Sequence, residues 1–256
     1  MRNLSWAFLG LVLSAGCVGA QNPADTDLGH DVHVRPLTEH TWLVSSVSNI
    51  ESFGDVQSNA VLAVGPRESV LVDTPATNEQ TALVLDWAEQ QLHRPVRHLV
   101  MTHWHQDRMG GIDIALKRQV ATYALGKTIE LARQHGLSLP EHELRSQDHL
   151  ALSGVLLETY YPGHGHTADN IVVWIGLDHV LDGGCFVKSM NARTLGNLAE
   201  INVPLWSKGV ASVRRRYPGA GIVVPGHGDV GGLELLQHTA ELLAQSENEK
   251  AVKSSK

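Results

Sequence analysis

Long apolar runs, cysteines and clustered basic residues are all scarce in this chain of 256 residues. Its N-terminal apolar run, "LSWAFLGLVL", has ten residues, whereas a membrane-spanning helix needs about 20. The main basic cluster is "RRRY" at 214–217, and such cations suit the end of a helix. A nucleic-acid binder needs a broader basic surface. We therefore expect no nucleic-acid partner and no stable membrane insertion of the mature protein.

The first 20 residues have the pattern of a secretory signal peptide. Arg2 precedes the apolar run, and small residues lead to Ala20. We expect cleavage after Ala20, with residues 21–256 forming a single domain in the periplasm. Lipid anchoring at Cys17 is the alternative, although Ser14 makes the match to a lipoprotein signal imperfect. Cleavage leaves 19 basic and 27 acidic residues, a net charge of −8 with neutral histidines.

Cysteine is limited to two residues, and the predicted cleavage removes Cys17. The remaining Cys185 has no partner for an internal disulfide, so an exported protein would carry one thiol. Two interpretations stay open. Cys185 is either a buried, inert core residue or a metal ligand held as a thiolate.

Two parts of the chain share one order of elements. Residues 58–74 predict a strand hairpin, 79–92 a helix, and the next strand ends at His103. Residues 168–184, 204–217 and the strand ending at His227 repeat that order. Further strands are predicted within 32–46 and 119–125, and further helices at 126–136 and 232–245. This pattern predicts an α/β fold of two packed sheets with helices outside, and a polar tail that frays from Gln245.

The strongest local signal is "THWHQDRMGG" at 102–111, directly after an apolar strand. If the chain stays extended there, His103, His105 and Asp107 project to one side, since strand side chains alternate. Imidazole and carboxylate ligands suit zinc. A structural pair of histidines on a loop is the alternative interpretation.

Five motifs in register resemble the metallo-β-lactamase superfamily, and specifically class B β-lactamases of subclass B1. They are "THWHQDRMGG", "GHT" at 165–167, "GGCFVK" at 183–188, "LGN" at 195–197 and "PGHG" at 225–228. The resemblance implies an αβ/βα sandwich of two mixed β-sheets with helices on the outer faces. Related lactonases and thioester hydrolases generally have His where this chain has Arg108. Asp182, before the Gly-Gly-Cys motif, departs from the family pattern.

The resemblance also implies two Zn²⁺ ions per chain. The first would be held by three histidines, and the second by a carboxylate, a thiolate and an imidazole. The implied ligands are His103, His105 and His166 for the first, and Asp107, Cys185 and His227 for the second. Three protein ligands per zinc leave open positions, which is typical of catalytic rather than structural zinc.

By the same resemblance, a zinc-bound hydroxide would open the β-lactam amide of penicillins, cephalosporins and carbapenems. Asp107 and Asn197 would be catalytic, with Asn197 also contacting substrate, and Lys188 would bind the substrate carboxylate. Phe53 would cover substrate from a flap at 48–59, while Arg108 and Asp73 would support the metal site from beneath. A surface role for Lys188, core packing of Phe53 and a strand-end role for Asp73 remain open.

Two other functions are consistent with parts of this pattern. One is a related zinc hydrolase acting on lactones or thioesters, and the other is a zinc-binding module without catalysis, which would need a closed four-ligand site. We expect a monomer.

His164 lies two residues before His166. On an extended chain both side chains face the same way, so alternation cannot show which of them is the metal ligand. The resemblance favours His166. We hypothesise that His164 is a spectator or a weak proton buffer at the lip of the site.

Overall fold

The computed structural model of the chain describes residues 25–51 and 53–254. The predicted signal peptide, including the alternative lipid site at Cys17, lies outside the described residues. Within the described part of the chain, no helix combines the length and apolar character needed to cross a bilayer.

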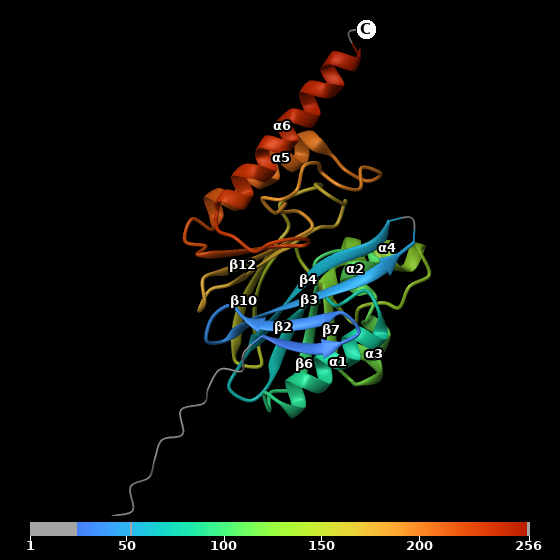
Figure 1. The fold of residues 1–256 in the computed structure, drawn as a ribbon, viewed down its shortest axis with the longest axis vertical. Coiled ribbons are helices and arrows are strands. Elements are labelled where there is room, and N and C mark those ends of the chain that lie inside the picture. Colours follow the sequence, from blue (N-terminus) through green and yellow to red (C-terminus); the bar gives the residue numbers. More distant parts are fainter. Residues whose placement is uncertain (1–24, 52, 255–256) are drawn as a thin grey trace, which may run out of the picture.

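Two mixed sheets form the centre of the molecule (Figure 1). The first has eight strands in sequence order: β1 (Thr26–Gly29), β2 (Val32–Pro36), β3 (Thr41–Ile50), β4 (Gly54–Val64), β5 (Ser69–Val72), β6 (Val96–Met101), β7 (Ala121–Leu125) and β8 (His142–Leu144). The second has five, in the order β13 (Ile222–Pro225), β12 (Val180–Gly184), β11 (Val172–Ile175), β10 (Val155–Tyr160) and β9 (Gln147–Leu152). The strands from β5 to β8 are parallel, as are β12 and β13, and the other pairs are antiparallel.

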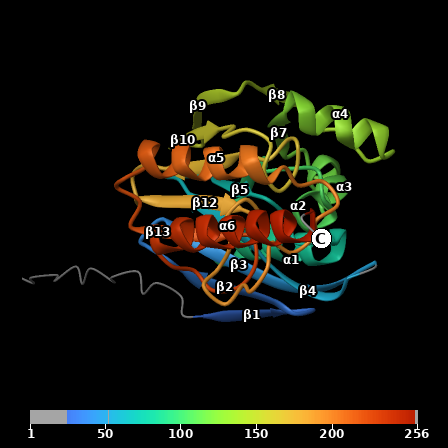
Figure 2. The same cartoon turned by 90° about the horizontal axis from the view of Figure 1, so that it is seen from above.

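Helices cover the outer face of each sheet, as Figures 1 and 2 show. Against the first sheet lie α1 (Asn78–Gln90), α3 (Ile112–Lys117) and α4 (Gly126–Gln134), and the short α2 (Gln106–Met109) lies within the segment 102–111. The second sheet is covered by α5 (Val203–Arg216) and α6 (Glu234–Ser254), which lie side by side. The predicted αβ/βα sandwich is confirmed.

Alternating side chains of the central strands separate the core into layers. On β5, Val70 and Val72 face the second sheet, whereas Leu71 packs beneath the helices of the first. From the second sheet, Ile175 and Val224 complete the layer between the sheets. Because each strand buries both faces, its apolar residues run almost continuously in the sequence.

The two halves repeat one connection, as the sequence predicts. In each, an antiparallel hairpin leads into a helix and then into a strand that lies parallel to the hairpin's second strand. The hairpin β4–β5 leads through α1 to β6, and the hairpin β11–β12 leads through α5 to β13. His103 and His227 therefore follow equivalent strands.

The structure continues α6 through Gln245 to Ser254, and the fraying predicted from Gln245 stays a prediction. Residues 245–254 contain neither glycine nor proline, and their Glu, Lys and Ala residues favour a helix. The polar composition of this segment therefore suits a helix as well as an irregular tail.

Candidate metal centre

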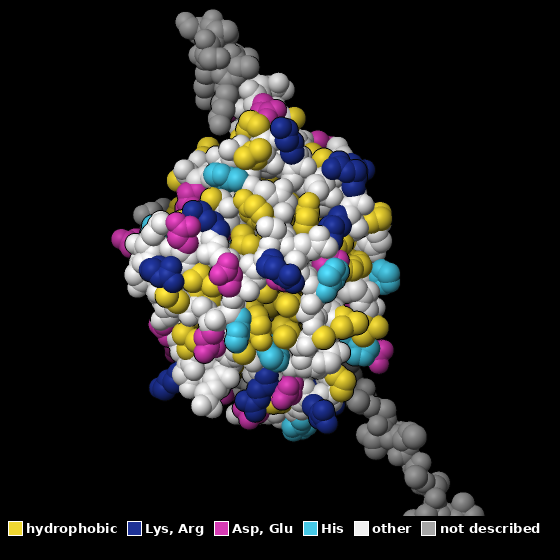
Figure 3. Space-filling view, turned by 180° about the vertical axis from the view of Figure 1, so that it is seen from behind, with side chains coloured by type: hydrophobic (Ala, Val, Ile, Leu, Met, Phe, Trp, Pro, Cys, Tyr) yellow, Lys and Arg dark blue, Asp and Glu magenta, His cyan; other side chains and the backbone are white. Residues whose placement is uncertain are grey.

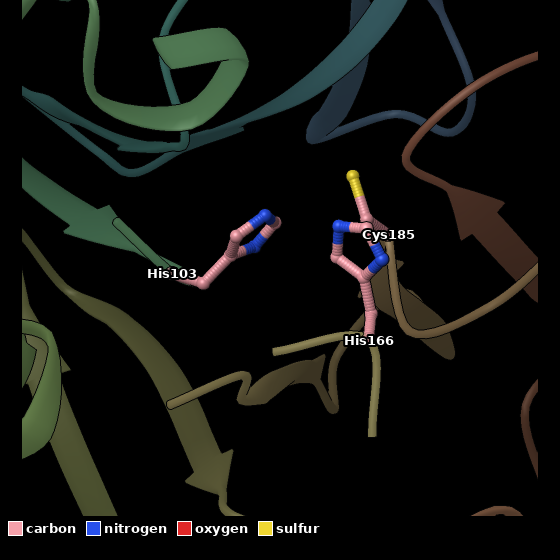
Figure 4. Close-up of side chains that lie close together, drawn as sticks. All are labelled: His103, His166 and Cys185. Atoms are coloured by element: carbon pink, nitrogen blue, oxygen red, sulfur yellow. The ribbon is translucent and has the colours of Figure 1, made fainter. Parts of the chain in front are cut away.

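Histidines, a cysteine and carboxylates meet at the carboxyl ends of four strands. Asp73 follows β5 and His103 follows β6 in the first sheet, while Cys185 follows β12 and His227 follows β13 in the second. Figure 4 shows the side chains of His103, His166 and Cys185 coming together from three separate segments of chain. Loops at such strand ends are free to carry functional groups because the sheets below are rigid.

The three predicted histidines surround one point. The ring centroids of His103 and His105 are 4.8 Å apart, those of His103 and His166 5.1 Å, and those of His105 and His166 5.2 Å. Burial lowers the pKa of both His103 and His166 well below the usual value, so their rings are neutral and have a lone pair to donate. The buried His103 Nε2 has no hydrogen-bond partner among the described residues, as expected of a metal ligand.

The second predicted set forms a tighter triangle. Cys185 Sγ lies 3.4 Å from Asp107 Oδ2 and 3.2 Å from His227 Nε2, and 3.3 Å separates the latter two atoms. Ligands about 2.0–2.3 Å from a tetrahedral zinc lie at roughly such separations. His227 Nδ1 donates to the Gln57 carbonyl at 2.7 Å. The hydrogen of the neutral ring is therefore on Nδ1, and Nε2, the corner of the triangle, keeps a free lone pair. Both donor sets fit metal ions.

Asp107 reaches this triangle by a different route from the predicted one. The chain is not extended through residue 107, because α2 begins at Gln106 with His105 as its N-cap. Asp107 thus projects from the first turn of a helix. His103 and His105 still point toward the common centre, since the chain has not yet turned into the helix at these positions.

Arg108 and Asp73, which the resemblance places beneath the metal site, bond to Asp107 and to Thr102 respectively. The fully buried Arg108 guanidinium donates to Asp107 Oδ2 through Nε and Nη2, at 3.0 and 2.9 Å. Burial alone would raise the pKa of Asp107. The Arg108 charge and the nearby imidazoles lower this pKa by a larger amount, so it lies well below its usual range. Asp73 accepts from the Thr102 backbone and hydroxyl, each at 2.7 Å, and thereby fixes the chain before His103.

Asp182, the departure from the family pattern, is a second buried carboxyl near Asp73. Its Oδ1 accepts from the Gly184 amide at 3.0 Å, whereas Oδ2 has no partner among the described residues. Burial, and then the Asp73 charge, raise the pKa of Asp182 to about 8. Asp182 therefore keeps a proton at neutral pH in the folded, metal-free protein.

Asp182→Asn is expected to stabilise the metal-free protein by about 1–3 kcal/mol at pH 8 and by much less at pH 4.5. The unfolded chain releases this proton above the ordinary pKa of 3.8, so the raised folded-state pKa costs stability progressively from pH 4 to about pH 8. Asparagine removes that cost. Urea unfolding at several pH values measures the change, with the exposed Asp31→Asn as control. An equal gain at both pH values would contradict this account.

A cavity of about 430 Å³ opens over the metal centre and includes the predicted substrate residues. Phe53 is 57% exposed and lines the cavity from the β3–β4 hairpin with Ile50 and Val56, so it does not fold onto the core. Lys188 also lines it but is buried, with Nζ 5.4 Å from the Trp206 ring centroid. Burial lowers the pKa of Lys188. Lys188 is thus a buried residue of the cavity wall rather than a solvated surface residue.

Asn197 lines the same cavity from the loop before α5. Its Oδ1 accepts from the Ala199 amide at 3.0 Å, which leaves the side-chain NH₂ group to donate to a ligand. A larger cavity of about 600 Å³ lies elsewhere, lined by His40, Arg94 and Asp178 among mostly apolar residues. None of the potential metal-binding groups among the described residues lies there.

Glu200 is a site residue that the sequence interpretation missed. Its Oε1 accepts from His105 Nε2 at 3.0 Å and its Oε2 from Trp104 Nε1 at 3.1 Å. This arrangement places the His105 hydrogen on Nε2 and leaves Nδ1 to face a metal. An acidic residue three positions after Asn197 was the only signal in the sequence.

Comparison with known proteins agrees with this geometry. Residues 53–227 match the metallo-β-lactamase superfamily. A type 2 metallo-β-lactamase of Bacteroides fragilis is 36% identical over 85% of this chain and 88% of its own, and one of Bacillus cereus is 35% identical over 83% and 82%. The structure of the metallo-β-lactamase FIM-1 from Pseudomonas aeruginosa, in its mono-zinc form, superimposes with a TM-score of 0.79 at 33% identity, covering 88% of this chain and 99% of that one. The chain belongs to the metallo-β-lactamase superfamily.

Proposed function

We propose that this protein is a zinc-dependent β-lactamase that opens the amide bond of penicillins, cephalosporins and carbapenems. The observation that carries the proposal is the pairing of a three-histidine cluster with an Asp107–Cys185–His227 triangle under one cavity. The relatives named as metallo-β-lactamases support the substrate class.

His103, His105 and His166 would hold one zinc ion, and Asp107, Cys185 and His227 a second. Zinc with an open position supplies a water molecule of lowered pKa, near 7, and polarises a carbonyl oxygen. The mono-zinc form of the Pseudomonas aeruginosa enzyme supports zinc as the metal.

The surrounding side chains would bind and orient the substrate. The Lys188 ammonium lies over the cavity, where partial desolvation strengthens its attraction for a carboxylate next to the lactam nitrogen. The free NH₂ of Asn197 would donate to the lactam carbonyl oxygen, whose negative charge grows during attack. Phe53, at the tip of the β3–β4 hairpin, would cover the apolar face of the ligand.

The cellular setting is part of the same proposal. The signal-peptide pattern of residues 1–20 supports export to the periplasm, where β-lactams act on the cell wall. On the face shown in Figure 3, acidic, basic and hydrophobic side chains are interspersed, and the described basic residues form no continuous patch there. The mixed charge of this face suits a small-molecule substrate, and we propose that the protein is a monomer.

The test is hydrolysis of a chromogenic cephalosporin by purified protein, with and without a chelator, coupled to zinc counting. We expect turnover that the chelator abolishes and added zinc restores, because the proposed chemistry requires the metal. A panel of penicillins, carbapenems, lactones and thioesters is run beside it. Folded, zinc-loaded protein that opens lactones or thioesters but no β-lactam would contradict the proposal.

A further inference from the structure

His164 makes a hydrogen bond that joins two segments of the site. Its Nε2 lies 2.5 Å from the main-chain carbonyl oxygen of Glu200. A carbonyl only accepts, so Nε2 must carry the hydrogen and donate it. The ring is half-buried between the segment that carries His166 and the loop that carries Asn197. This contact argues against the hypothesis that His164 is a spectator.

The loop in question comprises residues 195–202. Leu195 and Ile201 pack on the core of the second half, and the Glu200 carboxylate accepts from Trp104 and His105. Leu195 is buried, whereas Leu198 is 59% exposed and Gly196 has a positive φ of 78°. None of these residues belongs to a helix or strand. The middle of the loop, residues 196–200, contains no buried residue, so its conformation depends on hydrogen bonds.

Two of those hydrogen bonds join the loop to the segment before His166. The Asn202 amide donates to the Gly165 carbonyl at 3.0 Å, at the start of α5. The second is the bond from His164 to Glu200, in the middle of the loop. His164 thus fixes the main chain of Glu200, whose side chain is held separately by Trp104 and His105.

We propose that His164 is a positioning residue that holds the 195–202 loop in its substrate-binding conformation. This inference rests on the proposed function, since it concerns how Asn197 is presented to a β-lactam carbonyl. Without the bond, the loop samples other conformations, and substrate binding must supply the free energy that orders it again. The cost falls on binding rather than on the chemical step, because the loop of the bound complex has the same conformation.

The test compares His164→Ala, His164→Gln and wild type in three measurements: steady-state kinetics with a chromogenic cephalosporin, zinc content, and amide hydrogen exchange of residues 195–202. We expect His164→Ala to raise KM about three- to ten-fold with kcat nearly unchanged, as loss of one hydrogen bond predicts. Zinc content stays at the wild-type value, and exchange in the loop becomes faster. Glutamine carries an NH₂ at a similar distance, so His164→Gln restores both KM and slow exchange. The exposed His149→Ala serves as control.

Every result of these measurements either supports or overturns the positioning role of His164. Unchanged KM and unchanged loop exchange in His164→Ala would overturn the proposal, as would a loss of zinc, which would place His164 in the metal site. Failure of glutamine to restore the loop would show that the hydrogen bond is not what holds it. If wild type opens no β-lactam, the proposed function fails, yet the exchange measurement still reports whether His164 fixes the loop.

Discussion

Cys185→Ser is expected to lower kcat/KM for β-lactam hydrolysis by about 100-fold or more, while one zinc ion stays bound. Loss of a group that only orients a metal ligand already lowers activity or metal affinity about 10–100-fold. Cys185 is itself a proposed ligand. Serine has nearly the same shape, but its oxygen is a much poorer ligand for zinc than a soft thiolate. Zinc counting and steady-state kinetics on the same preparation measure the effect.

His166→Ala provides the matching control, because it removes a ligand from the other proposed site. It should keep the zinc of the Asp107–Cys185–His227 set and lose that of the three histidines. Burial raises the pKa of the Cys185 thiol in the metal-free protein, so zinc must displace a proton to bind there. Two zinc ions and full activity in Cys185→Ser would show that the sulfur is a core thiol only.

Most of the fold was predictable because its central strands are buried on both faces. The hairpins at 58–74 and 168–184, with the strands ending at His103 and His227, are apolar enough to stand out from the sequence. The second sheet's β9 and β10 were not predicted. Their residues alternate between buried and exposed, and the exposed positions include Leu156, so an edge hairpin of this kind has no clear apolar pattern.

Site residues that are close in the sequence could be predicted, whereas contacts between distant residues could not. His103, His105 and Asp107 lie within five residues, so their common role was visible, even though the assumed extended backbone was wrong at Asp107. The contacts of Glu200 with His105 and Trp104 join residues about 95 positions apart. No spacing rule connects such residues, and only the path of the loop before α5 brings them together.

Arg108→Ala is expected to destabilise the metal-free protein by about 3–5 kcal/mol, the largest stability change predicted here. The guanidinium is fully buried and bonds to the neighbouring Asp107 and to three other segments of chain. Its partners are Asp107, Asp73 Oδ2 at 3.3 Å, the Asn59 carbonyl at 2.5 Å and the Gly226 carbonyl at 2.8 Å. Because Asn59 belongs to β4 and Gly226 follows β13, Arg108 also joins the two sheets. Its loss leaves buried carboxylates without a counter-charge and carbonyls without a donor.

Two further variants separate charge from hydrogen bonding at this position. Arg108→Lys keeps the positive charge but has no planar fork, so it should recover only part of the lost stability. Arg145→Ala removes a cation whose side chain is 84% exposed and only 2.6 Å from Asp148, and it should cost about 1 kcal/mol or less. Urea unfolding in the presence of chelator measures all three. If Arg108→Ala and Arg145→Ala cost the same, the buried guanidinium does not organise the junction of the two sheets.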